Sequence, residues 1–221
     1  TGYPLELADD LVDATQNIDP LVHASAALRT CAVNLTKIAN DLRLMASGPI
    51  AGFGEIRLPA RQPGSSIMPG KVNPVMAEVV NQVAFRIMGN DLTVTLVAQA
   101  GQLELNVMQP VAFHALLESA DILANVLEVF TKYCVTGIEA NAEATRAQAE
   151  SIPGLATALN PYIGYDAATG IANEALATGR SIRELVLERE LMDEALLDRV
   201  LQPEALTSPR SLDFTGEEVI A

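Results

Sequence analysis

Apolar residues repeat at alternating steps of three and four along this 221-residue chain, and this spacing constrains the fold more than any other feature. One such seam runs from Leu21 to Met45 and a second from Phe113 to Cys134, while a shorter one, Val75 to Ile87, follows Pro74. The spacing is typical of amphipathic helices that pack along their whole length. The sequence therefore predicts an all-α fold built on a bundle of long helices.

The first seam ends at the helix-stopping run Ser47-Gly48-Pro49, and the second helix is expected to begin near Val111 and end before Gly137. Helices this long need long partners, which could come from within the chain or from other subunits. The predicted seam positions are Leu21, Ala24, Leu28, Cys31, Leu35, Ile38, Leu42 and Met45, then Val75, Val79, Val83 and Ile87, then Phe113, Leu116, Ala120, Leu123, Leu127, Phe130 and Cys134.

After Ile152-Pro153-Gly154 the predicted helices become short. Gly179 stops one of them, Ser181 and Glu184 form a capping box that opens the next, and a last helix ends before Pro203. We expect a central helical-bundle domain over 1–152, a small helical C-terminal domain over 153–206 and a tail over 207–221.

The composition excludes some partners. A formal charge of -14, without a basic stripe, makes a nucleic-acid partner unexpected. The sequence shows no signal peptide and no apolar run judged long enough to span a bilayer, so we expect no membrane association and a cytoplasmic location. Cys31 and Cys134 lie on apolar helical stripes and are expected to be reduced core residues.

The segment from Gly64 to Pro74, Gly-Ser-Ser-Ile-Met-Pro-Gly-Lys-Val-Asn-Pro, has a composition that favours ligand binding. It holds two hydroxyls, one ammonium and one carboxamide between glycines and prolines that oppose a regular helix. Lys71 is the only cation between Arg61 and Arg86. The segment, called the signature loop below, is thus predicted to bind a small anion such as a carboxylate.

The signature loop resembles the signature of the fumarase/aspartase superfamily, whose members add or eliminate across a fumarate-like double bond. Its flanks resemble the aspartate ammonia-lyase branch more than the class II fumarases. The resemblance covers nearly the whole chain and fades after about Pro203, while the amino-terminal half of the family is absent. The flanks that carry the resemblance are Asp13-Ala14-Thr15-Gln16-Asn17, residues 37–49, residues 75–83 and residues 102–110.

The resemblance implies reversible elimination of ammonia from L-aspartate to give fumarate. It also implies a homotetramer around a twenty-helix core, with each active site formed from three chains, so this chain is expected to be inactive alone. No organic cofactor is implied. Some family members have a divalent-metal activator, but the sequence shows no metal-ligand set for one.

The residue types of the loop limit how one of its serines could act as a base. A serine removes a carbon-bound proton only as an alkoxide, and no His or Asp stands beside it in the local sequence. Backbone amides of the loop and Lys71 could stabilise that anion. The resemblance assigns the base role to Ser65. It implies that Ser66 contacts the carboxylate next to the carbon that loses its proton, and that Lys71 and Asn73 hold the other carboxylate.

Further roles follow from the resemblance alone. Gly64 and Gly70 would be hinges that let the loop close. Glu78 would orient a histidine donated by another subunit, although a solvated first-turn acid is the simpler interpretation. Taken separately, Gly-Ser-Ser is an ordinary linker and Lys-Val-Asn-Pro an ordinary helix lead-in. The ordered eleven-residue match favours the functional interpretation.

The sequence does not assign a single role to four other polar residues. His23 and His114 lie on predicted helices without metal-ligand spacing, which favours surface or interface positions. Asn106 could place active-site loops or fill a structural role at a helix junction. The family often has Glu where this chain has Gln109.

The alternative functions are a class II fumarase, a more distant argininosuccinate or adenylosuccinate lyase, and a non-catalytic oligomerisation fragment.

Overall fold

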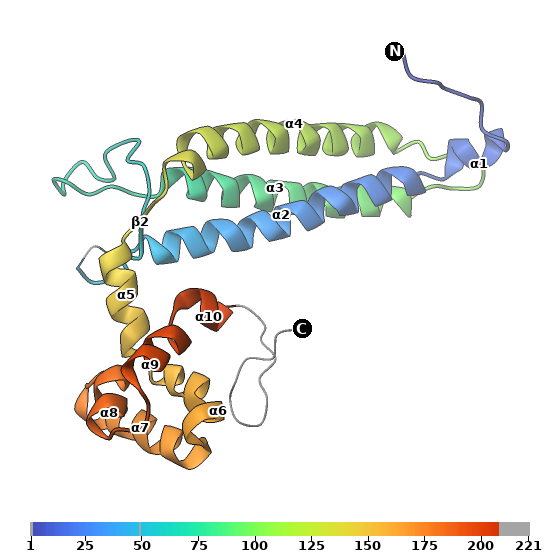
Figure 1. The fold of residues 1–221 in the computed structure, drawn as a ribbon. Helices are drawn as coiled ribbons and strands as arrows, with labels where there is room; N and C mark the ends of the chain where they lie inside the picture. The colour runs from blue at the N-terminus through green and yellow to red at the C-terminus, as the bar shows by residue number, and fades with distance from the viewer. Residues whose placement is uncertain (1, 49, 208–221) are drawn as a thin grey trace. The chain divides into compact units, whose positions relative to one another are not determined.

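The structure is a computed structural model that describes residues 2–48 and 50–207 (Figure 1). The chain divides into two compact units, Thr1–Asn141 and Ala142–Ala221, which are described separately. The predicted helix stop at Pro49 lies outside the described residues, as does the predicted tail 207–221 except for Thr207, which is the last residue of helix α10 (Pro203–Thr207). The regular secondary structure of the described part is helical, as predicted, apart from one two-stranded sheet.

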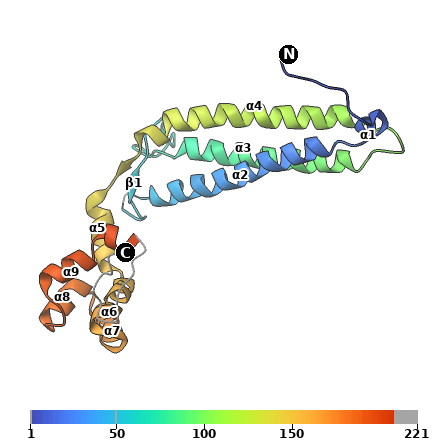
Figure 2. The same ribbon diagram turned by 45° about the vertical axis from the view of Figure 1, so that its right-hand side comes forward.

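The first unit is a bundle of three long helices, α2 (Asp19–Met45), α3 (Val75–Ala98) and α4 (Gln109–Tyr133). The short helix α1 (Leu11–Gln16) precedes them. Helix α3 packs against both α2 and α4, and the three lie side by side in each view (Figures 1 and 2). Prolines stand in the first turns of α2 and α4, where the missing N–H costs no helical bond. The predicted long-helix bundle is confirmed.

The buried stripe of α2 is rotated by one position from the predicted seam. Ser25, Ala32 and Ala39 are buried, whereas Ile38, a predicted seam residue, is 47% exposed. The physical reason is the size of the side chains, because alanine and serine allow two helix backbones to approach closely while larger residues lie at the margins. The predicted positions Leu28, Cys31, Leu35 and Leu42 do pack against the core from such margins.

Helix α4 shows the same pattern in its first half. Ala112, Ala115 and Ser119 are buried there, while the predicted seam residue Phe113 is exposed. In its second half Leu123 and Phe130 are buried as predicted. On α3, the predicted Ile87 is buried, but Val79 is exposed and the inward positions are Ala77, Val80, Asn81, Ala84, Asn90, Asp91, Val94 and Val97.

Many large apolar side chains on the bundle remain exposed in the single chain. They fall on all three long helices and face away from the bundle core. Burying such faces is the main source of helix stability in proteins, so these positions are suited to contacts beyond this chain. The exposed apolar residues on the helices are Val33, Ile38 and Leu44, then Val79, Phe85, Leu92 and Leu96, then Val111, Phe113, Leu117, Leu127, Val129 and Tyr133.

Two polar clusters join the helices near the middle of α3. The buried carboxylate of Asp91 accepts hydrogen bonds from Ser25 Oγ at 2.8 Å and Arg29 at 2.9 Å. On the α4 side, Glu118 accepts from Asn90 at 2.7 Å and pairs with Arg86. These bonds, led by the one from Asn90, lower the pKa of Glu118. Both clusters fix the register of neighbouring helices.

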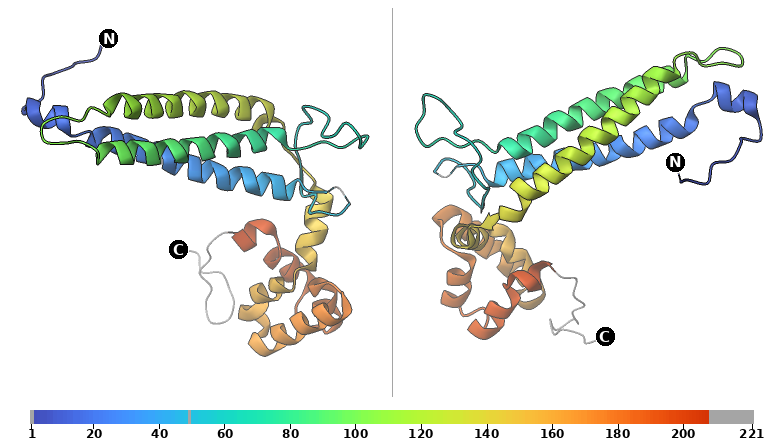
Figure 3. Two further views of the ribbon diagram at one scale, coloured as in Figure 1. Left: turned by 180° about the vertical axis from the view of Figure 1, so that it is seen from behind. Right: turned by 90° about the horizontal axis from the view of Figure 1, so that it is seen from above.

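The chain that follows α2 and the chain that follows α4 meet at one end of the bundle, where both helices end. Strand β1 (Ile56–Arg57) pairs antiparallel with β2 (Glu139–Ala140), which follows the short helix η1 (Val135–Gly137). The signature loop projects from this end and leads directly into α3 (Figure 3).

The second unit contains α5 (Ala142–Ser151), η2 (Pro153–Leu159), α6 (Asn160–Ile163), α7 (Tyr165–Thr178), α8 (Ile182–Glu188), α9 (Glu194–Val200) and α10 (Pro203–Thr207). It has its own apolar core, which includes Leu159, Ile171, Leu185 and Leu197. The unit begins with the first residue of α5, Ala142, whereas the sequence predicted a boundary after residue 152. Contacts between α5 and α8 explain this difference.

Two local signals predicted for this unit are present, but the helix predicted to be the last, α9, is followed by α10, which starts at Pro203 because proline is tolerated in the first turn of a helix. Ser181 Oγ accepts the Glu184 N–H and the Glu184 carboxylate accepts the Ser181 N–H, so the capping box is confirmed. Gly179 adopts a left-handed conformation directly after α7.

One stretch of the described chain, Gln109–Gly137, is long and apolar enough to cross a membrane by length and composition alone. The prediction that no such run exists was therefore wrong. The stretch comprises α4 and η1, and its buried side chains pack within the bundle. A helix that packs along its whole length against another helix needs a long apolar side. Such a helix can therefore match a membrane-spanning segment in length and apolar composition.

Candidate active site

The signature loop is closed at its base into a narrow neck. The Gly64 N–H donates to the Lys71 carbonyl at 2.7 Å, and Pro63 and Val72 form an antiparallel bridge beside it. At the tip, the Lys71 N–H donates to the Met68 carbonyl at 3.3 Å, and Gly70 has a φ of 77°, which favours glycine. The loop is therefore ordered by its own backbone rather than by regular secondary structure.

The hydroxyl oxygen of Ser65 is placed to accept backbone hydrogen bonds. The N–H groups of Ile67 and Met68 both donate to Ser65 Oγ at 3.2 Å. Two donors on one oxygen favour its charged form. Backbone amides and Lys71 were the groups expected to stabilise an alkoxide in this loop, and two amides donate to the serine that the resemblance singled out. Ser65 is half-buried, whereas the neighbouring Ser66 is exposed.

The second limb of the loop carries Lys71 and Asn73. Lys71 is exposed and forms no ion pair with any residue in 2–48 or 50–207. Asn73 Nδ2 donates to the Gly64 carbonyl at 3.4 Å, so this side chain lies at the neck. A Cβ on Gly64 would lie 2.8 Å from Asn73 Oδ1 and 2.9 Å from Asn73 N. Gly64 thus permits close contact between the limbs.

Glu78 lies in the first turn of α3, directly after the loop. Its backbone N–H donates to the Pro74 carbonyl at 3.1 Å. Its side chain is half-buried and has no hydrogen bond or ion pair with the part of the chain that the structure describes. The carboxylate is therefore free to bond a group that this chain does not provide.

The seven predicted site residues, Gly64, Ser65, Ser66, Gly70, Lys71, Asn73 and Glu78, all belong to the loop and the first turn of α3. The two histidines do not join them. His23 and His114 lie on exposed surfaces near the starts of α2 and α4, which is the opposite end of the bundle (Figure 1). Helix α2 has 27 residues, and a helix of this size is about 40 Å long. Neither histidine of this chain can reach its own loop.

Asn106 has a structural role where α3 turns into α4. Its Nδ2 donates to the Val97 carbonyl at 2.9 Å, and its Oδ1 accepts the Met108 N–H at 3.0 Å. The buried side chain thereby bonds the end of one helix and the start of the next. This far end also holds Gln109, whose Nε2 donates to the Thr15 carbonyl at 2.8 Å. An ionised glutamate could not donate that bond.

One contact near the loop was missed by the sequence analysis. Arg61 Nε donates to the Tyr133 carbonyl at 2.7 Å, and its guanidinium lies 5.1 Å from the centre of the Tyr133 ring. The two residues are 72 positions apart. The only signal in the sequence was the place of Arg61 just before the signature loop.

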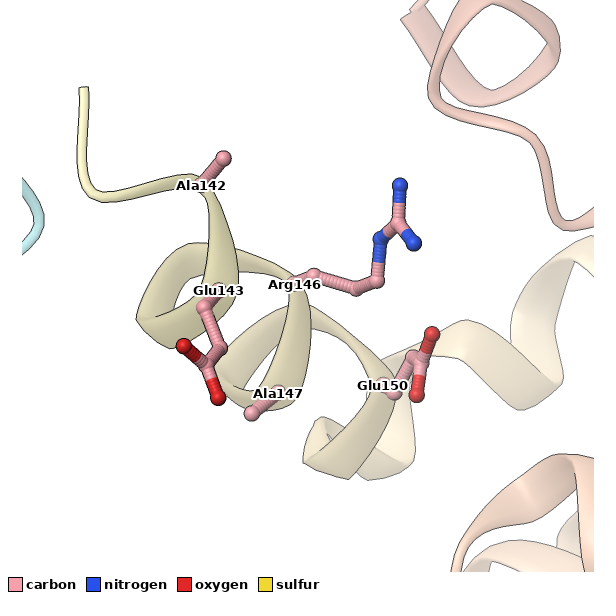
Figure 4. A pocket seen from close by; sticks show the side chains of 5 residues that line it. All are labelled: Ala142, Glu143, Arg146, Ala147 and Glu150. Atoms are coloured by element: carbon pink, nitrogen blue, oxygen red, sulfur yellow. The ribbon is translucent and has the colours of Figure 1, made fainter.

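Metal-ligand clusters and surface hollows are two other features that can mark a functional site. No group of three or more His, Cys, Asp or Glu side chains that could hold a metal ion occurs among residues 2–48 and 50–207. A shallow hollow follows one face of α5 and is lined by Ala142, Glu143, Arg146, Ala147 and Glu150 (Figure 4). All five residues come from one helix, and none belongs to the signature loop.

Two family descriptions match the chain. Residues 1–89 match the family described as Lyase, and residues 155–208 match the one described as Fumarase C C-terminus. An aspartate ammonia-lyase of Bacillus subtilis is 56% identical over 220 residues, which are 100% of this chain and 46% of that protein. An aspartate ammonia-lyase of a Bacillus species is 55% identical over 95% of this chain and 45% of its own length. The chain thus spans less than half the length of these relatives.

Solved structures show the same likeness. The crystal structure of the fumarate lyase:delta crystallin protein of Brucella melitensis bound to cobalt matches with a TM-score of 0.88 and 48% identity, over 94% of this chain and 45% of that one. A class II fumarase of Schistosoma mansoni matches with a TM-score of 0.83 and 35% identity, over 90% of this chain and 42% of that one.

Proposed function

Because the chain belongs to the fumarase/aspartase superfamily, we propose that the protein containing it is an aspartate ammonia-lyase, which eliminates ammonia from L-aspartate to give fumarate. The observation that carries the proposal is the pair of N–H groups that donate to Ser65 Oγ. They lie in a loop whose single cation suits a dicarboxylate. The relatives named aspartate ammonia-lyase are more similar to this chain than the class II fumarase is.

Ser65 acts in this mechanism as the base. As an alkoxide it takes a proton from C3 of L-aspartate, and the electron pair of that C–H bond moves into the neighbouring carboxylate to give the aci-carboxylate. That pair then forms the C2–C3 double bond as the C–N bond breaks, and the protonated amino group leaves as ammonia with the C–N electrons. Stabilising the aci-carboxylate formed on proton removal supplies most of the rate enhancement. The Ile67 and Met68 amides lower the cost of ionising the serine.

The remaining residues of the loop hold the substrate. Ser66 contacts the carboxylate next to the carbon that loses its proton, while Lys71 and Asn73 bind the other carboxylate. Gly64 and Gly70 serve as hinges of the closing loop. The free carboxylate of Glu78 orients a histidine of another subunit, because a carboxylate beside an imidazole fixes its tautomer and orientation.

The assembly proposed for the whole protein is a homotetramer, located in the cytoplasm. Support comes from the exposed apolar side chains on α2, α3 and α4, which a lone bundle leaves in water. It also comes from the separation of the histidines from the loop within one chain. An active site shared between chains follows. Because the 221-residue chain spans less than half the length of the aspartate ammonia-lyases it matches, it should associate when alone but should show no lyase activity.

The proposal is tested by offering the full-length protein fumarate together with ammonia and following both products. Aspartate should form far faster than malate. Efficient malate formation without aspartate would replace the proposal with a class II fumarase. A protein that assembles but forms neither product would be a non-catalytic oligomerisation protein instead.

A further inference from the structure

The residues that lead into the signature loop are bonded to the residues that follow α4. Residues 54–62 are called the approach segment. At its start, Asn141 Nδ2 donates to the Gly54 carbonyl at 2.9 Å, and the Asn141 N–H donates to the Glu55 carbonyl at 2.8 Å. Strand β1 then pairs with β2. The first half of the approach segment is therefore held by backbone hydrogen bonds.

Close packing continues this contact beyond β1. A Cβ on Gly137 would lie 2.6 Å from Cγ of Pro59, so the two residues approach as closely as a glycine allows. Leu58 packs beside them against the core of the bundle. The approach segment thus follows η1 back toward the end of α4.

Arg61 makes the last side-chain contact of this segment before the neck at Pro63. Its Nε donates to the carbonyl of Tyr133, the final residue of α4, at 2.7 Å. Carbonyls in the last turn of a helix have no helical partner and carry the negative end of the helix dipole, so a guanidinium is favoured there. The guanidinium also lies 5.1 Å from the centre of the Tyr133 ring, within the range of a cation–π interaction.

We propose that Arg61 is a positioning residue that fixes the Ser65 limb of the signature loop relative to the Lys71 limb. The Lys71 limb runs directly into α3, so a long helix holds it. The Ser65 limb has no such helix, and the neck bond between Gly64 and Lys71 joins it only to the other limb. Of the described contacts that attach this limb to the bundle, the one made by Arg61 lies nearest to the neck.

The consequence for catalysis rests on the proposed function. Loss of the attachment moves Ser65 relative to a substrate held by Lys71 and Asn73. Reaction rates are more sensitive than binding to such a shift, since a displacement of about 1 Å can cost on the order of 100-fold. The turnover number should therefore fall more than the Michaelis constant rises.

Lys132 provides a matched control. Its Nζ also lies 5.1 Å from the centre of the Tyr133 ring, but Lys132 is on α4 itself and so does not join the approach segment to that helix. Removing Lys132 takes away the same charge beside the same ring. It leaves the attachment of the loop unchanged.

The experiment compares Arg61→Ala, Arg61→Lys and Lys132→Ala in the full-length protein. We expect Arg61→Ala to lower kcat by about 10- to 100-fold with a smaller change in KM. Arg61→Lys should recover part of the loss, because lysine keeps one donor and the charge. Lys132→Ala should behave as wild type. Equal losses in the two alanine variants, or a rise in KM without a fall in kcat, would overturn the role.

A second readout does not depend on activity. In the 221-residue chain, Arg61→Ala should speed hydrogen exchange of the amides of residues 64–71, while the amides of α3 keep their protection. Unchanged exchange in the loop would overturn the proposal, even if the enzyme assay fails because the protein has another function. A full-length wild-type protein without lyase activity would instead count against the proposed function alone.

Discussion

The amide of Gly64 donates a 2.7 Å hydrogen bond to the carbonyl of Lys71 and so joins the two limbs of the signature loop. The serine proposed as base directly follows Gly64 on one limb. The cation proposed to bind substrate is Lys71 on the other limb. This backbone bond is the shortest hydrogen bond between the limb of the proposed base and the limb of the proposed substrate-binding cation.

Substitution of Gly64 tests whether the neck must be closed. Gly64→Ala should loosen the loop by on the order of 1–3 kcal/mol, because its Cβ would meet the backbone of Asn73 at 2.9 Å. Hydrogen exchange of residues 64–71 measures the effect. Gly89→Ala on α3 is the control, since its Cβ would have no neighbour within 4 Å and the change should stabilise the helix by about 0.5–1 kcal/mol. Equal loop protection in both variants would contradict this account.

Lys71→Ala tests the carboxylate contact. Loss of a hydrogen bond between two charged groups is worth about 1.5–3 kcal/mol, so KM for L-aspartate should rise by about 10- to 100-fold and kcat should also fall. Lys37→Ala removes another exposed lysine, one paired with Asp41 on α2, and should leave both constants unchanged. An unaltered KM in Lys71→Ala would make this residue a solvated loop cation.

The pH dependence of stability tests the cluster around Glu118. Asn90 and Arg86 lower the pKa of this carboxyl, so its contribution is present above the unfolded-state pKa of about 4.3. The contribution is lost as pH falls through the lower folded-state pKa. Glu118→Gln should therefore be less stable than wild type at neutral pH, with the difference shrinking in acid. Urea unfolding at several pH values measures this difference.

The exposed acid Glu128 on the same helix supplies the comparison for that measurement. Glu128 has no ion pair among the residues that the structure describes, so Glu128→Gln should follow the wild-type curve. A difference between wild type and Glu118→Gln that stays constant with pH would show that the Glu118 bonds are not linked to proton binding.

The sequence predicted the long helices because their apolar spacing is maintained over many turns. It misplaced their buried stripes because periodicity weighs large apolar residues, whereas Ala32, Ala39 and Ala112 occupy the closest contacts. The domain boundary was displaced for a related reason. The proline and glycine after Ile152 interrupt the chain, but α5 packs with the helices that follow them.

Resemblance to the superfamily was predicted from contiguous residues and is confirmed by the relatives. The roles of the individual site residues remain predictions. The amide donors at Ser65 could be anticipated because they lie within three residues of it. The Arg61–Tyr133 contact could not, because folding alone brings together two residues 72 positions apart.

The role of Ser65 is tested most directly by the turnover of Ser65→Ala in the full-length protein, measured as fumarate absorbance with saturating L-aspartate. The account predicts a barrier higher by on the order of 4 kcal/mol or more, which is roughly a 1000-fold loss of kcat, with unchanged assembly. Ser66→Ala is the comparison: it removes a contact to the aci-carboxylate but keeps the base, so it should lower kcat by a smaller factor than Ser65→Ala. Near wild-type turnover in Ser65→Ala would contradict the assignment of the base.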